Sequence, residues 1–354
     1  MHIPDGFVDI PTAVATGAVS LGVVTYAVRK TSKNLGERTI PLLGVTAAFI
    51  FAAQMLNFPV AGGTSGHFLG AMLAVALMGP WAASIVLTVV LIVQALGMAD
   101  GGITALGANV FNMGIVAVFV GFVLFYLLKK LLPRTLTGYL VSLAVASWMS
   151  VVLASAAASL ELAFSGTVPL RAALPAMVSV HMVIGIGEAL IATAVVAAVL
   201  VTRPDLVKSF DLPPETVRRT AGQPGLRMTR RTRFWAFVTG ALVVAVALAV
   251  FVSPFASGSP DGLERVAANE GFETAAAQQP VWGFSPLGDY QLPGLGNEKV
   301  ATAVVGFIGT VFLFALVGLL GRALSRSRAV AAPQTAGVRP TLPSGSSSDH
   351  SGTS

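Results

Sequence analysis

The chain has 354 residues, of which 55% are hydrophobic and only 11% are charged, and its mean hydropathy is +0.79. Because soluble domains carry roughly a quarter charged residues, this composition excludes an ordinary soluble domain and indicates a polytopic membrane protein. The net charge of +6 comes without a DNA-binding motif, so no nucleic-acid partner is expected, and the absence of cysteine excludes disulfides and thiolate metal sites.

Apolar segments along the whole chain predict membrane helices. Spanning a bilayer takes about 20 apolar residues, so the third and fourth segments are too short to cross comfortably. Gly79-Pro80 separates these two, because proline removes a hydrogen-bond donor and ends a helix. We expect them to form two short crossings or a re-entrant pair. The segments are 10–28, 39–57, 67–79, 81–97, 106–128, 136–160, 172–201, 234–253 and 300–321.

The basic residues predict the orientation of these segments. If the N-terminus is extracytoplasmic and every segment crosses, all but three of the 22 Lys and Arg residues lie in cytosolic loops or in the C-terminal tail. The exceptions are Arg171, Arg265 and Lys299. Cytosolic loops of membrane proteins are enriched in Lys and Arg, so we interpret the basic residues mainly as determinants of orientation.

The sequence predicts an all-α polytopic membrane protein with a seven-segment helical core and two C-terminal transmembrane helices. Residues 204–232 contain many Pro, Arg and Thr residues and indicate a cytosolic linker after the core of residues 1–203. Residues 233–325 hold the last two helices and an extracytoplasmic loop, and the polar residues 326–354 predict a disordered tail. His350 lies in this tail and is expected to be inert.

The start of the chain has a pattern that suits a metal ion. Residues 1–9 lack the basic region of a signal peptide, so we expect Met1 to be the mature N-terminus. The amine of Met1, the backbone nitrogen of His2 and its imidazole Nδ1 could then form two fused chelate rings. Three nitrogens in a plane suit Ni(II), Cu(II) or Co(II), provided that they are deprotonated. His67 is predicted on the same face and could supply a fourth nitrogen.

Small and polar residues surround both histidines. Pro4 and Gly6 bracket Asp5 and predict a turn that folds the N-terminus back into the helix bundle. The glycines before His67 allow positive φ angles and close approach of the backbone. Thr64 and Ser65 are expected to cap a short helix that starts near His67, and contact with the metal is the alternative role.

A second polar group lies within the predicted helices. His181 and Glu188 are seven residues apart and therefore share one helix face, where ionisable residues usually have a function. Asn109 is predicted either to orient the metal ligands or to bond between helices, and Gln94 and Asn112 are expected to do the latter. Trp282 and Tyr290 are typical of residues at the membrane surface.

These motifs resemble those of the cobalt/nickel substrate-capture membrane proteins of energy-coupling-factor ABC importers. The resemblance covers residues 1–203 and rests on Met1–Gly6, on Gly63–His67 and on the pair His181 and Glu188. Residues 257–290 resemble the small two-helix accessory subunit that is often fused behind such proteins in nickel systems.

The resemblance implies a function. Met1, His2 and His67 would hold Ni(II) or Co(II) as the transported substrate, in a multi-pass protein of the cell membrane. A coupling transmembrane subunit and two ATPase subunits would supply the energy. The family gives no settled role to His181 or Glu188.

Two alternatives remain open on the sequence alone. No P-loop motif occurs, so the chain is not expected to be an ATPase or another enzyme; the lack of His-Glu-x-x-His and of paired carboxylates argues against an intramembrane metalloenzyme. A self-sufficient secondary metal transporter or channel is the other alternative, although Glu188 is the only clear intramembrane acid in the predicted spans. The planar arrangement and the accessory segment favour nickel slightly over cobalt.

Overall fold

The computed structural model describes residues 1–33, 36, 38–213, 229–276 and 281–331, and most of these residues are helical. The predicted tail beyond residue 331, with His350, and much of the predicted linker lie outside the described residues. Within these described residues, seven helices are long and apolar enough to cross a membrane, which confirms the prediction of an all-α polytopic membrane protein.

The elements follow the predicted segments closely. The α-helices are α1 (Ile10–Ser32), α2 (Thr39–Gln54), α3 (Ala71–Met78), α4 (Pro80–Val93), α5 (Leu106–Asn109), α6 (Gly121–Leu131), α7 (Leu136–Phe164), α8 (Leu170–Thr202), α10 (Arg230–Ala247), α11 (Gly262–Glu270) and α12 (Glu298–Ala331). The π-helical segments are η1 (Gln94–Met98), η2 (Val110–Val120) and η4 (Leu248–Val252). Short 3₁₀ turns are η3 (Pro204–Leu206), η5 (Ser253–Phe255), η6 (Glu273–Ala275) and η7 (Gly288–Tyr290).

The break at Gly79-Pro80 lies where the sequence predicts it. Gly79 has a φ of 82°, which ends α3 after eight residues and lets α4 begin at Pro80. Eight residues of α-helix rise only about 12 Å, well short of the hydrocarbon core. The third segment therefore joins a short helix to the non-helical backbone of residues 67–70, and the polar groups of that backbone must find hydrogen-bond partners inside the protein.

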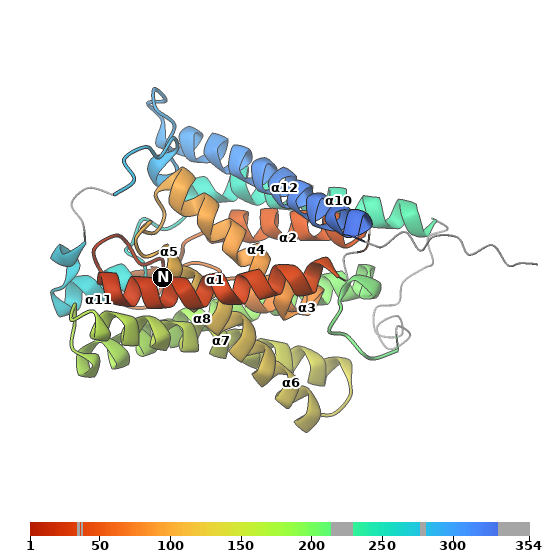
Figure 1. Cartoon of the computed structure of the whole chain (residues 1–354), viewed down its shortest axis with the longest axis horizontal. Coiled ribbons are helices and arrows are strands. Elements are labelled where there is room, and N and C mark those ends of the chain that lie inside the picture. The colour runs from red at the N-terminus through yellow and green to blue at the C-terminus, as the bar shows by residue number, and fades with distance from the viewer. Residues whose placement is uncertain (34–35, 37, 214–228, 277–280, 332–354) are drawn as a thin grey trace, which may run out of the picture.

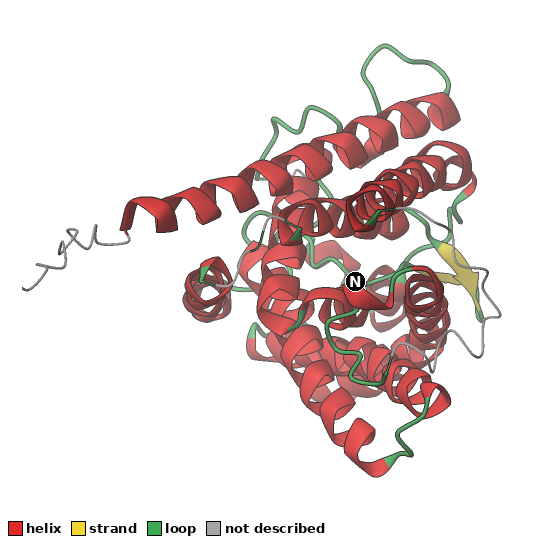
Figure 2. Ribbon diagram, turned by 90° about the vertical axis from the view of Figure 1, so that its right-hand side faces the viewer, coloured by secondary structure: helices red, strands yellow, loops and turns green. Residues whose placement is uncertain are grey.

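A small hairpin precedes this segment and was not predicted. Strands β1 (Phe58–Val60) and β2 (Thr64–Gly66) pair antiparallel, with Pro59 opposite Ser65. Gly62 and Gly63, both with positive φ, form the turn, which agrees with the conformational freedom expected of these glycines. The hairpin lies at one edge of the bundle (Figure 2), and its second strand ends directly before His67.

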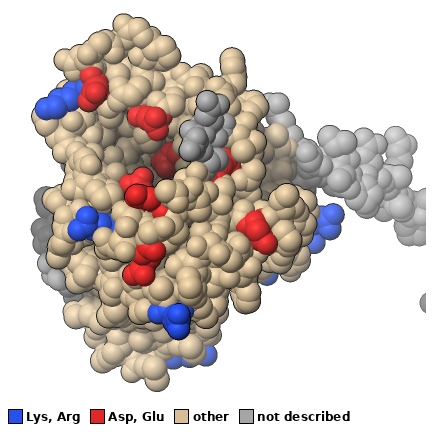
Figure 3. Space-filling model, turned by 90° about the vertical axis from the view of Figure 1, so that its left-hand side faces the viewer, with Lys and Arg blue, Asp and Glu red and all other residues tan. Residues whose placement is uncertain are grey.

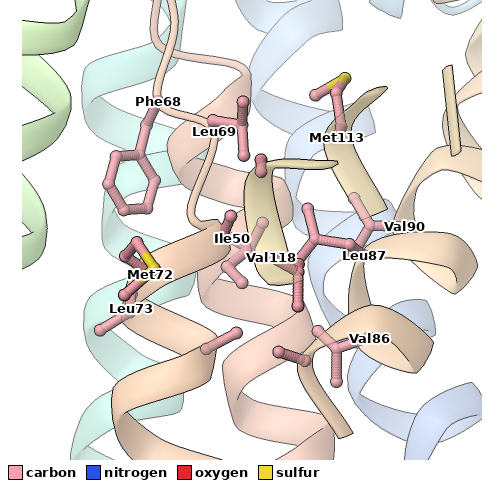
Figure 4. Packing of buried hydrophobic residues seen from close by; sticks show 14 of the residues in the cluster. Ile50, Phe68, Leu69, Met72, Leu73, Val86, Leu87, Val90, Met113 and Val118 are labelled. Carbon is pink, nitrogen blue, oxygen red and sulfur yellow. The ribbon is translucent and has the colours of Figure 1, made fainter. Parts of the chain in front are cut away.

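The last two long helices pack beside the others. Helices α10 and α12 lie along α2, and α11 packs against α8 near the end of the bundle that holds the N-terminus (Figure 1). Buried side chains such as Ile50, Phe68, Met72 and Leu87 interdigitate in the interior (Figure 4). Because lipid tails are as apolar as these side chains, close packing rather than exclusion of water stabilises the bundle.

Candidate metal site

The N-terminal residues are held inside the protein by a frame of hydrogen bonds. Asn109 accepts a bond from the backbone nitrogen of Ile3 at 2.8 Å and donates one to its carbonyl oxygen at 3.0 Å. The backbone nitrogen of Gly102 donates to the same carbonyl. Ile3 is fully buried, so these bonds set the position of the two residues before it. Asn109 therefore bonds to the N-terminal segment, and its role in orienting the metal ligands stays a prediction.

Asp5 closes the predicted turn. One carboxylate oxygen accepts bonds from the backbone nitrogen and the hydroxyl of Thr104, and the other accepts from the backbone nitrogen of Val281. Gly6 follows with a φ of 93°, a conformation that glycine adopts readily. Gly102 lies so close to Asp5 that a Cβ atom would collide with its backbone nitrogen. The turn and the loop of residues 99–105 are thus packed directly against each other.

Three nitrogen-bearing groups converge at this end of the bundle. The Met1 amine lies 2.8 Å from Nε2 of His67, and the rings of His2 and His67 stack with their centroids 5.1 Å apart. Two nitrogens bound side by side to one ion, each at about 2.0 Å and at a right angle, would be separated by about 2.8 Å. The spacing of Met1 and His67 is that of a hydrogen bond between the amine and Nε2, and it also brings both nitrogens within reach of one ion.

His67 is oriented for this role by its own backbone. Its Nδ1 lies 3.2 Å from the carbonyl oxygen of Phe68, so that Nε2 points to the Met1 amine. Because Nδ1 donates to that carbonyl oxygen, Nε2 presents its lone pair to the amine, and this neutral form of the imidazole is the one that binds metals.

Two carboxylates face the amine and His2. Asp261 Oδ2 accepts a bond from the Met1 amine at 2.6 Å, and Asp100 Oδ1 lies 3.1 Å from Nδ1 of His2. Burial alone raises the pKa of Asp261, but the positive Met1 amine, which also donates a hydrogen bond to it, outweighs burial and holds this pKa well below its usual range. Burial also raises the pKa of Asp100, but His2 and the hydrogen bond from Tyr290 outweigh it and hold this pKa below its usual range. Both carboxylates are therefore charged at pH 7.

Asp100 affects how His2 can bind a metal. The chelate predicted from the sequence uses Nδ1 of His2, and the structure pairs this atom with Asp100. For Nδ1 of His2 to bind the metal, His2 must therefore give up its contact with Asp100. Among the described residues, no group of three or more His, Asp or Glu side chains forms a metal cluster, so a site here depends on the N-terminal amine.

The predicted capping role of Thr64 and Ser65 is wrong. Both residues lie in β2, and α3 begins only after Gly70, which offers no side-chain cap. Thr64 is buried, and Ser65 donates its hydroxyl to the carbonyl oxygen of Ser259 at 2.7 Å. The helix starts later than predicted because residues 67–70 are not helical, and Ser65 bonds instead to the C-terminal part of the chain.

Glu188 supports the loop that carries His67. Its two carboxylate oxygens accept bonds from the backbone nitrogens of Leu69 and Gly70, at 2.6 and 2.9 Å, and Gln54 donates to the carbonyl of Leu69. These bonds satisfy the non-helical backbone within the bundle. His181 shares the face of Glu188 but does not join it: its Nδ1 bonds to the carbonyl of Met177, and its Nε2 has no hydrogen-bond partner among the described residues.

Comparisons with known proteins agree with this arrangement. The family described as "Cobalt uptake substrate-specific transmembrane region" matches residues 2–206, and the "PDGLE domain" family matches residues 235–326. The chain belongs to the cobalt-uptake substrate-specific family. Its second part belongs to the PDGLE domain family, and we refer to residues 235–326 as the accessory part.

Individual relatives extend over both parts. A putative fused nickel transport protein NikMN of Archaeoglobus fulgidus is 36% identical over 92% of this chain and 98% of its own. The fused nickel transport protein NikMN of Rhodobacter capsulatus is 30% identical over 92% of this chain and 99% of its own. A crystal structure of a truncated transition metal transporter shares 37% identity and a TM-score of 0.52, covering 56% of this chain and 98% of that protein.

The sequence does not predict the contacts that several residues make near the site. Asp100 and Asp261 have no sequence pattern that predicts them as partners of His2 and Met1. The hydroxyl of Tyr290 donates to Asp100 Oδ2 at 2.6 Å, a contact that its expected place at the membrane surface does not predict. Glu161 lies one residue beyond the end of the sixth predicted segment, yet it is buried in α7 and accepts a bond from Asn112 at 2.7 Å.

Replacing Glu188 by glutamine is expected to destabilise the protein and to weaken metal binding. The amide keeps the shape but turns one acceptor into a donor that faces a backbone N–H, and a buried N–H without a partner costs about 1–3 kcal/mol. Thermal unfolding in detergent and titration with Ni(II) measure both effects. Leu190→Ala on the same helix, at a side chain that is 67% exposed, is the control. Unchanged unfolding and affinity in Glu188→Gln would contradict this role.

Proposed function

We propose that this protein is the nickel- or cobalt-capturing subunit of an energy-coupling-factor ABC importer in the cell membrane. One observation carries the proposal: the Met1 amine lies between His67 and the accessory part, with His2 stacked on His67, in a chain of the cobalt-uptake family. The amine, the nitrogens of His2 and the imidazole of His67 would bind the ion at the extracytoplasmic end of the bundle.

Charge on this end of the molecule favours the approach of a cation. The predicted extracytoplasmic loop, residues 254–299, has more acidic than basic residues, and Asp and Glu side chains lie across the middle of this face (Figure 3). Such a field raises the local concentration of a divalent cation. In the same proposal, the basic loops at the other end lie in the cytosol, and residues 204–232 link the core of residues 1–203 to residues 233–325.

Nickel is the cargo that the comparisons favour. The relatives that match both the core and the accessory part are named nickel transport proteins. Relatives named cobalt transport proteins match shorter stretches, 37% to 60% of this chain. A planar set of nitrogens also suits Ni(II). Metal analysis of the purified protein, with Ni(II) and Co(II) in competition, tests this choice.

One observation bears on the alternative of a secondary transporter. Glu161 adds a second buried acid to Glu188, and one of its oxygens has no hydrogen-bond partner among the described residues. A proton relay through the membrane needs such groups. However, both oxygens of Glu188 already accept hydrogen bonds from the backbone nitrogens of Leu69 and Gly70, which argues against a role in carrying protons. We therefore propose that a coupling subunit and two ATPase subunits drive uptake.

Uptake is expected to need partners, whereas binding is not. In proteoliposomes that contain this chain alone, Ni(II) should bind without ATP and accumulate slowly at most. Addition of the coupling and ATPase subunits with ATP should give sustained accumulation. The measurement is the flux of Ni(II) into the vesicles, with and without ATP. Rapid accumulation by the chain alone would instead support the secondary transporter.

A further inference from the structure

The accessory part reaches the metal site through the segment Pro260-Asp261-Gly262-Leu263-Glu264. The carbonyl of Pro260 accepts a bond from the backbone nitrogen of Ser65 at 2.8 Å, which ties this segment to β2. On its other side, Arg265 donates to the carbonyl of Gly62. The segment is therefore docked along the hairpin that leads to His67.

Gly262 and Leu263 make the close approach possible. A Cβ atom on Gly262 would lie 2.7 Å from Cε1 of His181, so only glycine lets the backbone pass this close to α8. Leu263 is 1% exposed and anchors the start of α11 in the core. His181 thus supports the docked segment rather than the metal ligands directly.

The two oxygens of Asp261 have different partners. Oδ1 caps α11 by accepting bonds from the backbone nitrogens of Leu263 and Glu264, and Glu264 completes the capping box on the backbone nitrogen of Asp261. Oδ2 accepts the bond from the Met1 amine, and the side chains of Met1 and Asp261 are only 4% and 16% exposed. The cap holds the carboxylate rigid while Oδ2 faces the amine.

An amine that binds a metal through its lone pair still carries N–H groups. A carboxylate that accepts one of them orients the lone pair, and its negative charge offsets part of the charge of the cation. Outer-shell carboxylates act in this way on metal-bound histidines, where their removal lowers metal affinity about 10–100-fold. Asp261 has the contact, the rigidity and the burial for this role.

We infer that Asp261 is a positioning residue of the metal site, supplied by the accessory part, and that it orients the Met1 amine for the ion. The inference rests on the proposed function. If Asp261 has this role, the accessory part contributes a residue to the metal site. Tyr290 supports this assignment from the other side of the site, because it comes from the same part and bonds to Asp100, the partner of His2.

The variants Asp261→Asn and Glu264→Gln separate positioning of the amine from loss of a nearby negative charge. Asparagine is as good an N-cap as aspartate, so Asp261→Asn keeps the cap and removes the charge at the amine. Glutamine also completes a capping box, so Glu264→Gln keeps the cap and removes a charge that does not contact Met1. The experiment titrates NiCl₂ into the purified full chain, follows the d–d absorption of bound Ni(II), and records the melting temperature of each variant.

We expect Asp261→Asn to bind Ni(II) about 10–100-fold more weakly, with a shifted absorption band, as for loss of an outer-shell partner. Glu264→Gln should retain the affinity and spectrum of the unmodified chain. Equal losses in both variants, or no change in Asp261→Asn, would overturn the inference. If Asp261→Asn does not fold, Asp261→Ser, which also caps a helix, is judged by the same criteria. Failure of the unmodified chain to bind Ni(II) would refute the proposed function instead.

Discussion

One residue inserted between Met1 and His2 is expected to abolish high-affinity metal binding. The insertion moves the imidazole out of reach of the fused chelate rings and separates the amine from His67, which now lies 2.8 Å away. Met1 is 5% exposed, so the site has no room for an extra residue without rearrangement. The loss of Ni(II) affinity should exceed about 100-fold, the upper end for removing a mere outer-shell partner.

Titration of the purified variant with Ni(II) tests this expectation, and its melting temperature shows whether it has folded. A tag at the N-terminus should have the same effect because it blocks the amine. A tag at the C-terminus is the matched control, since it follows the predicted tail and should leave the affinity unchanged. Full affinity in a folded, N-terminally blocked protein would refute the proposed ligand set.

The sequence predicts much of the fold because its signals are local. Each apolar segment predicts one helix from its own residues, and Gly79-Pro80 marks a break from two residues alone. The Lys and Arg residues in the loops predict only the orientation of these helices. The turn at Asp5 and the approach of His2 to His67 also follow from such signals, because the predicted orientation places both on one face. These predictions need no knowledge of which helices pack together.

The carboxylates of the site were not predictable in the same way. Asp261 and Met1 are 260 residues apart, and Tyr290 and Asp100 are 190 apart. No periodicity or spacing links such pairs, since the accessory part must first dock on the core. The wrong prediction for Thr64 and Ser65 has a related cause. A Ser or Thr before an apolar run predicts a helix cap, but here the distant Glu188 accepts hydrogen bonds from the non-helical backbone of Leu69 and Gly70.

His67→Ala is expected to remove most of the metal affinity, while His181→Ala is expected to keep it. The first change deletes the nitrogen that faces the amine, and the loss should exceed about 100-fold, beyond that for an outer-shell partner. His181 is 1% exposed and packs against Gly262, so its loss should lower stability by about 0.5–3 kcal/mol, the usual range for one substitution.

Both effects are measured on the same preparations, by Ni(II) titration and by thermal unfolding. His350→Ala, in the predicted tail, controls for the loss of a histidine as such and should change neither quantity. Loss of binding in His181→Ala with retention in His67→Ala would show that the ion is bound near α8 instead. The two buried histidines differ in one respect that decides the expected outcome: Nε2 of His67 points to the Met1 amine, whereas His181 is committed by Nδ1 to its own helix.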